Sequence, residues 1–267
     1  MKYYGTCFTT RIKQKGGLGE MKIDEAAFEK AREKVIGVDR QRPTIGTLME
    51  KSVHAILKNY YEPDEDHQEI PIENYVADIY RNEEILEIQT RQFYKMRGKL
   101  TAFLPLYPVT IVYPIPKEKW LYWIDEETGE ISEKRKSPLK GNVYMAFDEL
   151  YGIKMFLKDP NLRFKFVLLD IEEYKLLNGW SKDRKKGASR YDRIPLRIVE
   201  EVDVTCLQDY MQFVPYDLPE EFSVKEFAKA AHIRADLATT VVNILYHVGA
   251  IDRIGKKGRA FVYSVME

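Results

Sequence analysis

The chain has 267 residues, of which 45% are hydrophobic, and its 42 basic and 42 acidic side chains leave a formal net charge of zero. This length predicts about two domains with real hydrophobic cores. A neutral chain carries no global signal of nucleic-acid binding, so any basic surface must be local. Cys7 and Cys206 lie far apart and fit no metal-ligand spacing, which favours a reducing compartment over a disulfide scaffold.

The N-terminal end lacks a long apolar core, and the longest uncharged stretch, residues 101–116, contains four prolines and is too short to cross a bilayer. We therefore expect a cytoplasmic protein without a membrane partner. Residues 1–43 are interpreted as an appendage with a polar helix near 24–36, to which we assign no function.

Residues 44–61 have apolar side chains at helical spacing and predict an amphipathic helix, which Thr44 can cap. Glu50 lies at the border of the apolar face. His54 follows one turn later and could lean toward the site, although we favour its interpretation as a satisfied surface histidine.

Residues 75–81 and 84–90 alternate as two short strands around a turn at Asn82 and Glu83. With the turn centred there, Asp78 lies directly opposite Glu87. Two carboxylates that face each other across a ladder repel, and a divalent cation between them would relieve the repulsion. The alternative is an ordinary solvated acidic face, which the hairpin taken alone favours; the upstream helix with Glu50 shifts the balance toward a site.

This order of helix, strands and acidic residues resembles the PD-(D/E)xK nuclease superfamily, over about 75 of the 267 residues. The resemblance implies an α/β (α+β) fold, in which a restriction-endonuclease-like mixed sheet is flanked by helices. The matching segments are a helix near 44–61, strands near 68–73, 75–81 and 84–90, a helix near 92–104 and a strand near 108–115.

The resemblance also implies a Mg²⁺ or Mn²⁺ site and metal-assisted hydrolysis of phosphodiester bonds. Asp78 and Glu87 would be direct ligands, the carbonyl of Ile88 would be a third, and Glu50 would hold a metal-bound water. Without metal, we expect at least one of these acids to have a raised pKa, because the carboxylates repel each other. Gln89 stands where the family has lysine and would orient water without carrying charge.

That departure leaves open whether the chain cuts nucleic acid. Lys95, Arg91 or Arg97 could supply the missing positive charge, and Arg91 shares a strand face with Gln89 by parity. For Arg91, a solvated strand end is an equally good interpretation.

Residues 109–116 and 120–124 are predicted strands, 142–157 a helix, and 164–169 and 195–204 further strands. Trp120, Tyr122 and Trp123 are interpreted as core residues rather than as a base-stacking platform, because strands favour aromatic side chains.

A basic segment precedes the last of these strands. Residues 178–197 contain seven basic and two acidic residues, with glycines that break regular structure. Such a loop is suited to contacts with a phosphate backbone, although a solvated basic linker has the same composition. The candidate nucleic-acid contacts here are Lys182, Arg184, Lys185, Lys186, Arg190 and Arg193.

Residues 205–267 predict three helices, at 206–214, from the capping box of Ser223 and Glu226 onward, and at 234–248, followed by a hairpin at 251–265. This pattern resembles a winged helix-turn-helix domain. The resemblance implies DNA contact through the third helix and the hairpin wing, although such domains also serve as protein-binding modules. The wing candidates are Arg253, Lys256, Lys257 and Arg259.

Together these features predict an appendage (1–43), a nuclease-like domain (44–204) and a winged-helix-like domain (205–267) in a metal-dependent DNA nuclease. Cutting both strands of a duplex would usually require a homodimer. One alternative is a nuclease fold without catalytic activity that binds DNA as a regulator, and Gln89 favours it. Another is an interaction scaffold that binds no nucleic acid, which the neutral charge favours.

Overall fold

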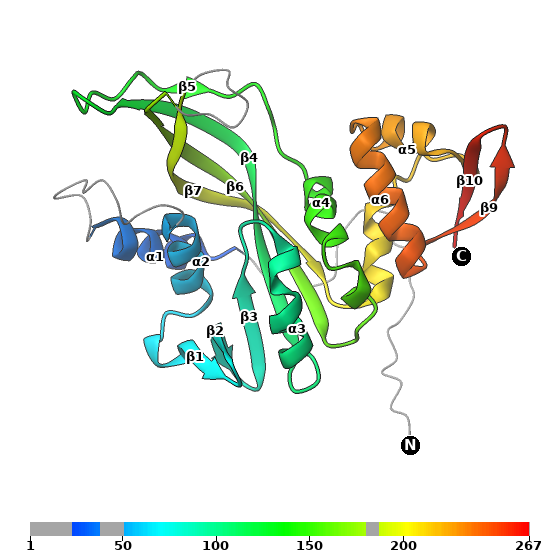
Figure 1. Ribbon diagram of the computed structural model, residues 1–267, viewed down its shortest axis with the longest axis horizontal. Helices are drawn as coiled ribbons and strands as arrows, with labels where there is room; N and C mark the ends of the chain where they lie inside the picture. Colours follow the sequence, from blue (N-terminus) through cyan, green and yellow to red (C-terminus); the bar gives the residue numbers. More distant parts are fainter. Residues whose placement is uncertain (1–22, 38–50, 180–186, 267) are drawn as a thin grey trace.

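A mixed sheet forms the centre of the computed structural model, which describes residues 23–37, 51–179 and 187–266 (Figure 1). The sheet has seven strands in the order β1-β2-β3-β4-β6-β7, with β5 paired to β4. Neighbours are antiparallel except that β4 runs parallel to both β3 and β6. The strands are β1 (Gln68–Ile72), β2 (Tyr75–Arg81), β3 (Glu84–Ile88), β4 (Val109–Asp125), β5 (Arg135–Lys136), β6 (Leu162–Leu177) and β7 (Ser189–Val204).

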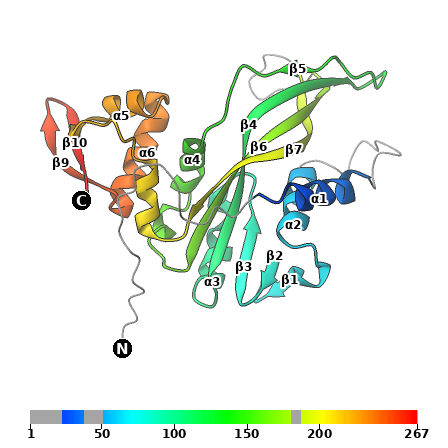
Figure 2. The same cartoon turned by 180° about the vertical axis from the view of Figure 1, so that it is seen from behind.

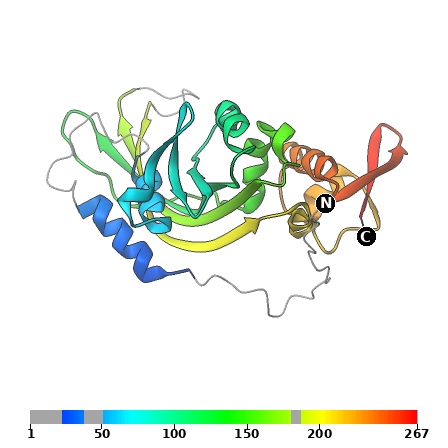
Figure 3. The same cartoon turned by 90° about the horizontal axis from the view of Figure 1, so that it is seen from below.

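Helices cover both faces of this sheet, as its two hydrophobic clusters show. On one face, α2 (Lys51–Tyr61) packs Val53, Ile56 and Leu57 against residues of β2 and β3, and α1 (Glu25–Gly37) lies beside it (Figure 3). On the other face, Leu100 and Phe103 of α3 (Arg97–Phe103) pack against the opposite side of the strands. The predicted mixed α+β architecture with flanking helices is therefore confirmed at this level.

Further short helices complete these layers. They are η1 (Glu65–His67), η2 (Phe93–Met96) ahead of α3, and α4 (Ala146–Tyr151) between η3 (Val143–Met145) and η4 (Lys154–Phe156). The helix predicted at 142–157 is thus divided into three short pieces, and the helix predicted near 92–104 begins as a 3₁₀ turn.

β4 and β6 are much longer than predicted and project beyond the core as an arm (Figure 1). The two strands expected at 109–116 and 120–124 are one strand, because its parallel pairing with β6 continues past a register shift between Pro116 and Glu118. The prediction that Trp120, Tyr122 and Trp123 belong to a core is wrong, because these side chains are only partly buried on the arm.

The C-terminal part begins with a 3₁₀ helix, η5 (Leu207–Phe213), in place of the expected α-helix. It continues as β8 (Glu221–Phe222), α5 (Val224–Ala230), α6 (Ala235–Val248), β9 (Ile251–Lys257) and β10 (Ala260–Val265). The strands form a second sheet in the order β8-β10-β9. The capping box of Ser223 and Glu226 is present as predicted, and Gly249 ends α6 with a left-handed φ of 83°.

The C-terminal part shares one continuous core with the large sheet. The ring of Phe213 lies 5.2 Å from that of Phe147 on α4 and 6.1 Å from that of Phe166 on β6. The Lys154 ammonium donates a hydrogen bond of 2.7 Å to the side chain of Asn243 on α6. Figure 2 shows α4 between the large sheet and α6, so the predicted boundary at residue 205 falls inside a packed core.

None of the helices in the described ranges is long and apolar enough to cross a membrane.

Candidate functional site

The hairpin of β2 and β3 opens at the two predicted acidic residues. Its ladder has the predicted register and ends at the pair of Ile79 with Leu86, one step before Asp78 and Glu87. There the side chains replace ladder bonds: the amide of Asp78 donates to Glu87 Oε1 at 3.3 Å, and the amide of Ile88 donates to Asp78 Oδ2 at 2.8 Å. The two carboxylates are therefore adjacent as predicted, but they lie where the strands separate rather than across a closed ladder.

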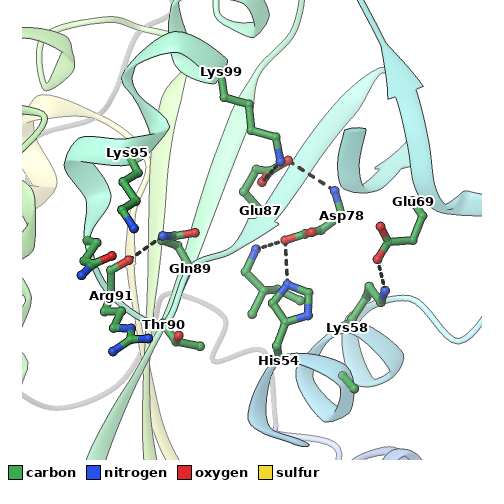
Figure 4. A pocket seen from close by; sticks show the side chains of 13 residues that line it. His54, Lys58, Glu69, Asp78, Glu87, Gln89, Thr90, Arg91, Lys95 and Lys99 are labelled. Carbon is green, nitrogen blue, oxygen red and sulfur yellow. Dashed lines mark hydrogen bonds and ion pairs between the residues drawn. The ribbon is translucent and has the colours of Figure 1, made fainter. Parts of the chain in front are cut away.

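The separated strands border a cavity of about 620 Å³ (Figure 4). One wall is α2, and the opposite wall is the segment that runs from the end of β3 through η2 into α3. The lining residues are His54, Ala55, Lys58, Glu69, Asp78, Glu87, Ile88, Gln89, Thr90, Arg91, Gln92, Lys95 and Lys99.

Glu87 is 3% exposed and forms an ion pair of 2.6 Å with the ammonium of Lys99. Its pKa is raised from 4.5 to about 7, because burial disfavours the charged form and the negative charge of Asp78 adds to the effect. Lys99 offsets only part of this increase. The raised pKa agrees with the expectation for a metal-free carboxylate pair.

Asp78 has a pKa below its ordinary value. Burial acts to raise this pKa, but it is outweighed by the hydrogen bond and charge of His54, the hydrogen bond from the amide of Ile88 and the charge of Lys99 together. The His54 Nε2 atom lies 3.1 Å from Asp78 Oδ2. The interpretation of His54 as an ordinary surface histidine is therefore wrong, because its ring lies against Asp78 and lines the cavity.

Lys99 is the cation that the sequence analysis missed. Of the three residues expected to compensate for Gln89, Lys95 and Arg91 line the cavity, whereas Arg97 donates to the carbonyl of Gly152 at 2.8 Å. Lys99 lies four residues after Lys95, and that helical spacing is a signal from which Lys99 could have been predicted.

Gln89 lies in the cavity wall, and its side-chain nitrogen is bonded to the backbone of its own segment. Its amide nitrogen donates to the carbonyl of Arg91, two residues on. This contact holds the backbone after β3, where Gln92 takes a left-handed conformation with φ of 59° and reverses the chain into η2.

The other predicted contacts divide into three groups. Arg190 lies at 3.7 Å from the carboxylate of Glu173, and Arg193 is only 9% exposed, so Arg193 does not offer the surface contact expected of it. On the wing, Arg253 and Lys256 lie 4.4 and 4.7 Å from the ring of Phe261. Five candidates fall outside the described residues: Glu50, Lys182, Arg184, Lys185 and Lys186.

A divalent cation fits the carboxylate pair on chemical grounds. Mg²⁺ is commonly held by one or two carboxylates and keeps several of its waters. Asp78 and Glu87 supply such a pair, and the carbonyl of Ile88 is the predicted third donor. After burial, the negative charge of Asp78 is the next cause that raises the pKa of Glu87, and a cation between the two acids would offset that charge. In the ranges that the structure describes, no group of three or more His, Cys, Asp or Glu side chains converges as a fuller ligand set.

Residues 51–205 match the family described as a domain of unknown function, DUF8091, and the chain belongs to this family. The matched range runs from the first turn of α2 to the end of β7 and contains every residue that lines the cavity. The chain is also 26% identical over 230 residues to an uncharacterized protein of Treponema pallidum (strain Nichols), a match that covers 82% of this chain and 87% of that protein. No solved structure matches the chain.

Proposed function

We propose that this protein is a metal-dependent phosphodiesterase that cleaves DNA, with Asp78 and Glu87 at its catalytic centre. The observation that carries the proposal is the carboxylate pair at the point where β2 and β3 separate, in which Glu87 is buried, Asp78 is half-buried and Lys99 lies on Glu87. Acids with displaced pKa values that line an open cavity are typical of catalytic and metal-binding sites.

Asp78, Glu87 and the carbonyl of Ile88 would hold Mg²⁺ or Mn²⁺. When bound, the ion would acidify a water molecule and neutralise charge on the phosphate. Lys99 would supply the positive charge that the family's lysine provides, from α3 instead of from β3, and would shift toward the phosphate once Glu87 has a metal partner. Gln89 would then keep the loop after β3 in place rather than orient water.

The architecture supports the resemblance to PD-(D/E)xK nucleases. The elements α2, β1, β2, β3, α3 and β4 follow one another in the expected order, with the two helices on opposite faces of the sheet. β4 lies beside β3 and parallel to it.

The C-terminal part supports the winged-helix interpretation in the same way. Its helices and strands alternate as η5, β8, α5, α6, β9 and β10, and β10 lies between β8 and β9. DNA contact here would come from the wing, because the exposed face of α6 carries Thr239 and Asn243 rather than cations, and Asn243 is bonded to Lys154. Arg253, Lys256, Lys257 and Arg259 would contact the phosphate backbone.

The proposal includes a cytoplasmic location, and cleavage of both strands of a duplex would require a second copy of the chain.

The test is a cleavage assay on end-labelled single-stranded, duplex and branched DNA with Mg²⁺, Mn²⁺ or EDTA. The proposal expects products only with metal, and none from Asp78→Asn or Glu87→Gln, while the matched surface variant Glu127→Gln cuts like the wild type. Products that persist in EDTA or in both site variants would rule the proposal out.

A second candidate is a DNA-binding regulator with the same fold and no hydrolysis. The observation in its favour is that Gln89 is folded onto a backbone carbonyl and each carboxylate already has a cationic or hydrogen-bonding partner. Binding of DNA that weakens steeply with salt, without products under any metal condition, would favour this candidate.

A further inference from the structure

The cavity has a second group of cations beside the carboxylate pair. Lys95 and Arg91 lie at the end formed by the segment after β3, and the ammonium of Lys95 extends into the cavity toward Gln89 (Figure 4). Lys95 and Lys99 are four residues apart on consecutive helical turns, so both side chains reach the same side of the segment.

This segment is anchored to α4 from the side opposite the cavity. The amide of Phe93 donates to Glu149 Oε2 at 2.9 Å, and Arg97 Nε donates to the carbonyl of Gly152 at 2.8 Å. These bonds fix where η2 begins and how it is rotated. They therefore place the backbone of Lys95 at the cavity end, from which its exposed side chain extends into the cavity.

The charges of the lining favour an anion at this end. Four basic side chains line the cavity against three acidic ones, the acidic residues being Glu69, Asp78 and Glu87. Lys58 pairs with Glu69, and Lys99 pairs with Glu87. Among the described residues, no carboxylate forms an ion pair with Lys95, so its charge remains available to a ligand.

Within the described part of the chain, the lining contains no phenylalanine, tyrosine or tryptophan, and its one aromatic ring, the imidazole of His54, is bonded to Asp78. Proteins that hold the bases of single strands usually stack them on aromatic rings. Lysine, arginine, glutamine and threonine side chains instead suit phosphate oxygens, which carry no sequence information.

We propose that Lys95, together with Arg91, binds the phosphate next to the one at Asp78 and Glu87, so that the cavity holds a nucleic-acid strand by two consecutive phosphates and without regard to base. The position of the neighbouring phosphate rests on the proposed function; the anion site at Lys95 does not.

The experiment measures the binding of short, fluorescently labelled single strands of about six nucleotides in EDTA, where no cleavage occurs. One phosphate at a time is replaced by an uncharged methylphosphonate. In the wild type, we expect the replacement at one position to weaken binding about tenfold, which corresponds to the loss of one charge-assisted hydrogen bond. In Lys95→Gln, that penalty falls below about twofold because the partner cation is absent.

The full penalty should remain in Lys158→Gln, which changes an exposed lysine outside the cavity lining. Equal penalties at that position in the wild type and in Lys95→Gln would overturn the proposal. A strand with abasic sugars should bind within about threefold of the normal strand, and a loss beyond about tenfold would show base recognition and overturn the base-independent part.

The outcomes separate this proposal from the proposed function. A penalty that depends on Lys95, in a protein that cuts no DNA under any metal condition, would support the anion site and reject the hydrolysis. Metal-dependent cleavage with no Lys95-dependent penalty would support the hydrolysis and reject the anion site.

Discussion

Replacing Glu87 with Gln should stabilise the metal-free protein at high pH and have little effect at low pH. Glu87 is 3% exposed and has a pKa raised from 4.5 to about 7, chiefly by burial and by Asp78. The folded state therefore keeps this proton over a range in which the unfolded chain has lost it. Stability is then fully present below pH 4.5 and is lost as the pH rises through about 7.

The shift in the pKa of Glu87 sets the size of the effect. At 1.36 kcal/mol per pKa unit, it corresponds to about 3 kcal/mol lost by the wild type above pH 7. Gln resembles the protonated acid and loses nothing across this range. The ion pair with Lys99 forms only while Glu87 is ionised, so its contribution is already contained in the pKa of about 7 and adds no separate cost.

The assay is urea unfolding in EDTA at pH 5 and pH 8, with Glu127→Gln as a control for the loss of one surface carboxyl. We expect the free energy of unfolding of Glu87→Gln, relative to the wild type, to be higher at pH 8 than at pH 5 by about 2 to 3 kcal/mol. A difference that does not change with pH, or that falls as the pH rises, would refute the assignment of the raised pKa to Glu87.

Three further predictions concern Lys99, the contact of Glu149 with the segment after β3, and the wing. Lys99→Met should abolish cleavage while DNA affinity falls less than tenfold, and Lys99→Arg should keep part of the cleavage rate. Wild-type turnover in Lys99→Met would contradict the role of this cation. Glu149→Gln should lower the free energy of unfolding by about 1 kcal/mol, because a neutral acceptor replaces the charged one that the amide of Phe93 donates to. The same variant should also cut more slowly. Thermal denaturation measures the first effect and single-turnover rates measure the second. Lys257→Gln combined with Arg259→Gln should reduce the slope of log affinity against log salt by about 2, whereas Thr239→Ala on α6 should leave it unchanged; the reverse pattern would place DNA on α6.

Local features of the fold could be predicted from the sequence because short-range rules determine them. The turn at Asn82 and the strand alternation gave the register of β2 with β3, and thus the proximity of Asp78 to Glu87. The capping box at Ser223 and the C-cap at Gly249 depend only on neighbouring residues, and both are present.

The features that were missed arise from contacts between distant segments. The parallel pairing of β4 with β6 joins residues about fifty positions apart and lengthens both strands into the arm, which no local pattern indicates. His54 and Lys99 reach the carboxylates from two helices on opposite faces of the sheet. The rings of Phe147 and Phe213 join the C-terminal part to the large sheet across the boundary expected at residue 205.

All the proposed chemistry depends on the carboxylate pair binding a divalent cation, so the most direct test is a Mn²⁺ titration followed by electron paramagnetic resonance, which counts free Mn²⁺. The wild type should take up Mn²⁺ at Asp78 and Glu87, while Asp78→Asn should lose that uptake and Glu127→Gln should keep it. Equal uptake by the wild type and Asp78→Asn, or no uptake by either, would contradict the account.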